Sequence, residues 1–222
     1  MLAAFLVSRI EEGPIPDKKS LTVKKEGFSL DKLICFPAVP AAILLLFNGL
    51  IHTCISNYLS LYGLERNLEN VGFFFTINAV TMIAVRPLTG RLCDRHPLAL
   101  VIIPGYIGEM ATALILALTS NMISVAVAAV FYGIGFGSVQ AAIQIMAVRS
   151  VGPERRGDAN GTFYVGGDIG LALGAYGAGA IFDAAGSMAM YLFMASMAVL
   201  CILFYIVYQF HIRLKKQSAP AV

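Results

Sequence analysis

Six long apolar runs constrain this chain more than any other feature of its sequence. A helix needs about 20 mostly apolar residues to cross the hydrocarbon core of a bilayer, and each run is roughly that long. The runs cover Leu33–Leu61, Val71–Leu88, Leu98–Thr119, Ile123–Val148, Gly161–Ala184 and Met188–Phe210. Of the 222 residues, 58% are hydrophobic and 13% are charged, which leaves too few polar groups to cover a water-soluble protein of this size. The sequence therefore predicts an all-α integral membrane protein with six transmembrane helices.

The residues that flank the runs suggest three parts. Met1–Val7 is apolar but too short to span a membrane, and it has neither the basic region nor the cleavage site of a signal peptide. Ser8–Lys32 is polar and carries two prolines and several lysines. We expect residues 1–32 to be the end of a preceding helix followed by a cytoplasmic linker. Residues 33–211 would form the six-helix domain, and residues 212–222 a cytoplasmic tail.

The basic residues predict which way the helices run through the membrane. Of the 16 Lys and Arg residues, all except Arg66 fall at the two ends of the chain or in the connections after the second and fourth runs. With six spans, those segments share one side of the membrane. Positive loops stay on the cytoplasmic side, so both termini are expected in the cytoplasm of a multi-pass protein of the cell (plasma) membrane. Because this role in orienting the helices explains the basic residues, we do not expect them to bind nucleic acid.

The sequence offers no support for catalysis or for a bound metal. The four cysteines are Cys35, Cys54, Cys93 and Cys201, and neither a CxxC pair nor a His/Cys cluster with metal-ligand spacing is present. The patterns GxxxxGK[ST], GxSxG and HExxH are also missing, so an ATP-driven pump, a serine hydrolase and a zinc protease are disfavoured. We expect no enzyme activity, no cofactor and no metal ion.

Two of the connections carry patterns that resemble a known family. Arg86–Arg95 reads RPLTGRLCDR and fits RPxxGxLxDR, while Pro153–Gly161 reads PERRGDANG. Both resemble loops in the carboxyl-terminal six-helix half of the major facilitator superfamily, and the resemblance covers nearly the whole chain. Phe73–Thr76 and Gly167–Gly170 are similar to segments of members that export drugs and metabolites. The chain departs from the family at His96-Pro97, where a basic run normally follows.

The resemblance implies a fold and a function. The fold would be half of a major facilitator transporter, built as two three-helix inverted repeats. The function would be secondary active transport of a small organic molecule or drug, which we expect to be efflux by proton-coupled antiport. Because such transporters bind substrate between two halves, a second six-helix half, either another copy or a separate chain, is an expected partner alongside substrate, protons and the lipid bilayer. A truncated half that does not transport by itself, and only associates with other membrane proteins, is the alternative.

The first of these connections is expected to act as a gate. In the family such a loop locks the cytoplasmic side, and Arg86, Gly90, Asp94 and Arg95 would carry that role here. Gly90 would permit a tight turn, Asp94 would accept hydrogen bonds from a helix N-terminus, and the arginines would pair with carboxylates or carbonyls. The alternative is that this connection is a plain turn, whose positive charges only fix the orientation of the helices in the membrane.

Ionisable residues within the runs are candidates for proton coupling, because charge at membrane depth is costly. Asp168 lies about 12 Å along the fifth run, at 1.5 Å per residue. It would bind a cationic substrate or carry a proton, with an interhelical hydrogen bond as the alternative. Glu109 lies near the middle of the third run. It is a second candidate for proton coupling, with a structural bond to the second or sixth run as the alternative.

Neutral polar residues form stripes on the other runs. Asn48, His52 and Ser56 follow a four-residue spacing on the first run, and Gln140 and Gln144 do so on the fourth. Asn78 gives the second run a weaker polar face. We expect Asn48, His52, Asn78, Gln140, Gln144 and Asp168 to line the substrate cavity. Interhelical hydrogen bonding is the alternative for the two glutamines, and a lone membrane histidine such as His52 is as often a hydrogen-bonding residue.

Overall fold

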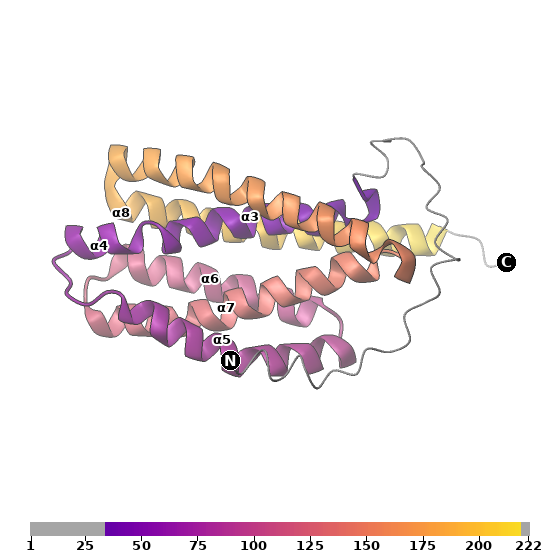
Figure 1. The fold of residues 1–222 in the computed structure, drawn as a ribbon, viewed down its shortest axis with the longest axis horizontal. Helices are drawn as coiled ribbons and strands as arrows, with labels where there is room; N and C mark the ends of the chain where they lie inside the picture. The colour runs from indigo at the N-terminus through magenta and orange to yellow at the C-terminus, as the bar shows by residue number, and fades with distance from the viewer. Residues whose placement is uncertain (1–33, 219–222) are drawn as a thin grey trace, which may run out of the picture. The chain divides into compact units, whose positions relative to one another are not determined.

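The computed structural model describes residues 34–218, with side chains as far as residue 214, and this part of the chain contains helices and no strands (Figure 1). The described elements are η2 (Phe36–Ala38), α3 (Val39–Ser56), α4 (Leu59–Glu65), α5 (Phe73–Arg95), α6 (Ala99–Leu118), α7 (Met122–Arg149), η3 (Pro153–Arg155) and α8 (Arg156–Ser218). The all-α prediction is confirmed. The helix end and linker expected over residues 1–32, and the last four residues of the expected tail, lie outside the described residues.

Five helices of the described part are long and apolar enough to cross a membrane. The first four predicted runs correspond in order to α3 with α4, α5, α6 and α7. The last two runs both lie on α8, which has 63 residues and one non-helical position, Gly186. Gly186 has φ +76°, a left-handed conformation that glycine adopts without steric cost. The chain therefore reverses there, and the two arms of α8 lie side by side in opposite directions (Figure 1).

The turn predicted at Gly90 is wrong, because α5 continues through the whole RPLTGRLCDR segment and ends at Arg95. Gly186 is the one described glycine with positive φ, so Gly90 is an ordinary helical residue. The helix stops at His96, whose backbone is extended with φ −128° and ψ 161°. A proline disfavours the helical conformation of the residue before it, and Pro97 follows directly. The motif is thus the last part of a helix rather than a loop.

Glycines hold α3 against the first arm of α8. A Cβ added to Gly170 would overlap the carbonyl oxygen of Leu46, and one added to Gly166 would overlap the carbonyl oxygen of Ala42. On α3, a Cβ at Gly49 would lie 2.9 Å from the carbonyl oxygen of Gly167. Small residues let two backbones approach closely, which is a main source of helix association in membranes. The two helices therefore touch backbone to backbone along this seam.

The short helix α4 ties helix ends together at the end of the bundle that holds the Gly186 turn. The Tyr62 hydroxyl donates to the carbonyl oxygen of Thr119, in the turn between α6 and α7, at 2.7 Å. The backbone N–H of Ser187 donates to Glu65 Oε2 at 3.1 Å, so this carboxylate binds the start of the second arm of α8. Figure 1 shows α4 beside that turn of α8. We call this region the α4 end.

The glycine seam gives a test of the packing. Gly170→Ala should lower the free energy of unfolding by about 1–3 kcal/mol, because an added methyl group must push two packed backbones apart. Gly177→Ala is the matched control, since a Cβ at Gly177 meets nothing within 4 Å. The control should be neutral or slightly stabilising, because alanine favours a helix over glycine. Thermal unfolding in detergent, followed by circular dichroism, measures both. Equal midpoints of thermal unfolding for the two variants would contradict the close backbone contact at Gly170.

Candidate functional site

A cavity of about 360 Å³ lies between α3, α7 and the first arm of α8. It is lined by Leu45, Asn48, Gly49, His52, Phe136, Gln140, Tyr164, Gly167, Asp168 and Leu171. The fold thus brings together four of the residues predicted to line a substrate cavity, Asn48, His52, Gln140 and Asp168, from three helices. The glycine seam contributes directly, since Gly49 and Gly167 form part of the wall.

A second cavity of about 350 Å³ adjoins the first and extends it toward the α5 motif. Gln140 and Tyr164 line both cavities, and Gln144 and Arg86 line the second. The Gln144 amide donates to the Tyr164 hydroxyl at 3.0 Å, which joins α7 to α8. Asn78 lines neither cavity, and its Oδ1 is buried without a partner among the described residues. Five of the six predicted residues therefore share one polar face.

Asp168 has an unusual environment for a carboxylate on a membrane helix. Its side chain is exposed in the described part of the chain and opens into the first cavity. No residue between 34 and 214 forms a hydrogen bond or an ion pair with it, so the interhelical bond considered as an alternative is not formed there. A carboxylate at membrane depth needs water, a cation or a hydrogen-bond donor. The cavity is the place from which such a partner can reach it.

Aromatic residues of α7 fix the imidazole of His52. His52 Nδ1 and the Tyr132 hydroxyl are 2.7 Å apart, and the imidazole stacks on the Phe136 ring with centroids separated by 4.7 Å. The sequence prediction missed both aromatic residues. The sequence spacing could have identified them, because Tyr132 and Phe136 continue the four-residue stripe of Gln140 and Gln144 toward the start of α7.

Glu109 is placed behind the cavity wall rather than in it. Its side chain is fully buried, and its Oε1 accepts a hydrogen bond of 3.0 Å from the Asn48 amide. The other carboxyl oxygen, Oε2, has no partner among the described residues. The bond expected to the second or sixth run is wrong, since the partner belongs to the first run. Asn48 also lines the cavity, so one side chain connects Glu109 to it.

At the opposite end of the bundle from α4, Asp94 binds an arginine. Arg149 Nη2 lies 3.2 Å from Asp94 Oδ1, and Nη1 of the same guanidinium donates to the Cys93 carbonyl oxygen at 3.1 Å. A helix N-terminus was the expected partner of Asp94, but the bound group is the side chain of Arg149, the last residue of α7. This contact ties the end of α5 to the end of α7. Within residues 34–214, neither Arg86 nor Arg95 has the expected carboxylate or carbonyl partner.

Comparison with known proteins identifies the family. The model of the Major Facilitator Superfamily matches residues 3–221, which is almost the whole chain. The chain belongs to the major facilitator superfamily. Members of this superfamily carry small molecules across membranes, and the long apolar helices are those of a multi-pass membrane protein.

A relative from Methanocaldococcus jannaschii, described as an uncharacterized MFS-type transporter, is 26% identical over 187 residues. The match covers 82% of this chain and 48% of the relative. The chain therefore spans about half the length of the curated relative it matches.

The Asn48–Glu109 contact gives a test of the site geometry. Asn48→Ala and Glu109→Ala should show a coupling of about 0.6–1.7 kcal/mol in a double-mutant cycle of unfolding free energies, the range of interhelical hydrogen bonds in membranes. Gln144→Ala combined with Glu109→Ala is the control pair and should be additive, because Gln144 binds Tyr164 instead. A coupling of zero for Asn48 and Glu109 would contradict the bond.

Proposed function

We propose that this chain forms half of a secondary active transporter that exports a small organic molecule in exchange for protons. The observation that carries the proposal is Asp168, a carboxylate without a protein partner in the described part of the chain that opens into a cavity at membrane depth. A cavity of about 360 Å³ lies within the range that holds small organic ligands.

The lining of the cavity suggests a substrate class. Phe136, Leu45 and Leu171 supply apolar surface, while His52 and Gln140 supply hydrogen-bonding groups. Asp168 is the one acidic group in the lining. An organic cation with an apolar body would pair its charge with the carboxylate and bury its body against the aromatic and aliphatic side chains. We propose this class of substrate.

Competition at Asp168 would couple the two fluxes. A proton on the carboxyl group removes the charge that holds an organic cation, and release of that proton restores it. Substrate and proton then occupy the same group in turn, which is the requirement for antiport. Glu109 is a second proton-carrying candidate, because its unpartnered oxygen lies one hydrogen-bonded side chain away from the cavity, through Asn48.

A second six-helix half would complete the transporter. The proposal is supported by the length of the relative, of which this chain covers 48%, and by the polar face, which lipid would not satisfy. The distribution of basic residues supports the placement of both termini in the cytoplasm, and we propose the plasma membrane as the location. The end of the bundle with Asp94 and Arg149 would then face the cytoplasm. The alternative is a half that does not transport alone and only associates with other membrane proteins.

Asp168→Asn tests the coupling. The amide keeps the size and hydrogen bonding of the side chain but cannot exchange a proton. In proteoliposomes, this variant should lose both the uphill export of organic cations and the coupled proton flux that an entrapped pH-sensitive dye reports, because the neutral amide, like a protonated carboxyl group, does not hold the cation. Asp158→Asn is a matched control, because this exposed carboxylate pairs with Arg155 outside the cavity, and it should transport normally.

The outcomes separate the two functions. Normal uphill export by Asp168→Asn would show that Asp168 is structural and would direct attention to Glu109 or His52. No transport by the unsubstituted chain, together with transport when a first half is supplied, would support the half-transporter. No transport in either case would leave association as the function.

A charge exchange tests the gate. Asp94→Ala should slow transport by about two- to fivefold with little change in substrate affinity, because an exposed ion pair contributes up to about 1 kcal/mol. Asp94→Arg combined with Arg149→Asp should restore part of the rate, since the pair re-forms with reversed polarity. If Asp94→Ala transports at the wild-type rate, the segment is not a gate and only fixes the orientation of the helices in the membrane.

A further inference from the structure

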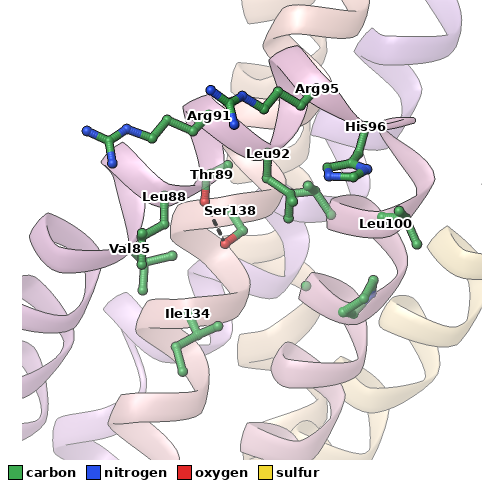
Figure 2. A pocket seen from close by; sticks show the side chains of 13 residues that line it. Val85, Leu88, Thr89, Arg91, Leu92, Arg95, His96, Leu100, Ile134 and Ser138 are labelled. Carbon is green, nitrogen blue, oxygen red and sulfur yellow. Dashed lines mark hydrogen bonds between the residues drawn. The ribbon is translucent and has the colours of Figure 1, made fainter.

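A groove of about 550 Å³ lies between α5, α6 and α7, at the end of the bundle where Asp94 binds Arg149 (Figure 2). Its lining has a basic part and an apolar part. Basic side chains, Arg91, Arg95 and His96, lie at one end, and apolar side chains such as Leu88 and Ile134 line the rest. The lining contains no acidic side chain. The groove therefore differs from the substrate cavity, whose one charged group is a carboxylate.

The basic end lacks a counter-ion within residues 34–214. Arg91 and Arg95 are one helical turn apart, on the same face of α5, and Figure 2 shows both side chains projecting from that helix. Neither forms an ion pair with a described residue, and the neighbouring carboxylate of Asp94 is bound to Arg149. Like charges one turn apart repel each other. An anion placed between the two guanidinium groups would relieve that repulsion.

The whole groove, basic end included, has about the length of one membrane leaflet. The stretch of α5 that lines the groove, from Val85 to His96, extends about 16 Å at 1.5 Å per residue. The hydrocarbon core of a bilayer is about 30 Å thick, so the groove is about half as long as that core. Leu88 is 63% exposed and Leu100 is 56% exposed, so the described part of the chain leaves these walls uncovered. The floor is closed by a hydrogen bond of 3.1 Å between the Thr89 and Ser138 hydroxyls (Figure 2).

We propose that this groove binds one anionic glycerophospholipid, with its phosphate between Arg91 and Arg95 and an acyl chain along Val85, Leu88 and Ile134. His96 lines the same end of the groove. A zwitterionic lipid would bring a cationic group close to the same arginines, so an anionic headgroup is preferred. Basic pockets between transmembrane helices recognise anionic headgroups for the same reason.

The chain contains no tryptophan, so one introduced indole reports on the groove alone. Leu92→Trp places a fluorophore in the lining, and Leu88→Trp provides a second position. The full chain is reconstituted into phosphatidylcholine vesicles containing a small fraction of brominated phosphatidylglycerol or brominated phosphatidylcholine. Leu203→Trp, on an exposed face of α8 that does not line the groove, is the control reporter. We expect brominated phosphatidylglycerol to quench the two groove reporters severalfold more strongly, and the control reporter equally with both lipids.

Variants then test each part of the groove. Arg91→Gln and Arg95→Gln should each reduce the preference for phosphatidylglycerol about fivefold. Arg156→Gln removes an exposed arginine that does not line the groove, and it should leave the preference unchanged. Ile134→Phe, which narrows the apolar part, should reduce quenching by both lipids, whereas Ile123→Phe on an exposed position of the same helix should not.

Three results would overturn the proposal. Equal quenching of the groove reporters by the two lipids would show ordinary boundary lipid. Absence of quenching by either lipid would show that protein covers the groove. Reversal of the quenching by glycerol 3-phosphate at the concentration of the lipid would show that a soluble phosphate, and not a lipid, takes the site.

Discussion

The backbone contact between α3 and the first arm of α8 determines the positions of the functional groups. Gly49, Gly166 and Gly170 leave no room for a Cβ, so these two helices meet without intervening side chains. Residues that flank the seam then face each other at short range. Asn48 and His52 on α3 and Asp168 on α8 thereby line one cavity, although more than one hundred residues separate them in the sequence. Larger residues at the seam would widen the cavity and separate the polar groups.

The cavity also depends on buried polar contacts behind its wall. Asn48 donates to Glu109 and His52 contacts Tyr132, so the inner polar atoms of two lining residues are already engaged. Such contacts restrict the rotation of the amide and the imidazole and hold them at fixed positions. Asp168 has no comparable partner within the described residues and stays available to a ligand. This division between anchored and free groups explains why a proton-coupling role is proposed for Asp168 first and for Glu109 second.

Much of the helical arrangement could be predicted from the sequence, because length and apolar character determine which segments span a membrane. The predicted runs Leu98–Thr119 and Ile123–Val148 differ from α6 and α7 by one residue at each end. Helix ends governed by local backbone chemistry were harder to predict. Gly90 suggested a turn, but it lies inside α5. The helix ends at Arg95 because Pro97 disfavours a helical conformation of His96.

The site could be predicted in part, because helical spacing shows which residues share a face. It does not show which helix that face meets. Gln140 and Asp168 line one cavity, and their role in substrate binding stays a prediction, while the partners expected for Glu109 and Asp94 were wrong. Asn48 and Arg149 are separated from them by 61 and 55 residues, and only the packed bundle brings these pairs together.

The contacts of α4 join helix ends at the α4 end of the bundle. Tyr62 and Glu65 join the turn between α6 and α7 to the turn within α8, so these helix ends share a common fastening. At the opposite end, α5 and α7 are linked through an exposed ion pair, and the backbone N–H of Cys35 donates to the Thr162 hydroxyl at 2.8 Å. A tilt of about 5° around the fastened end displaces the far end of a helix that crosses a 30 Å core by roughly 3 Å. If the helices tilt about the α4 end during transport, the largest displacement would fall on the end that carries Asp94, Arg149 and the basic groove.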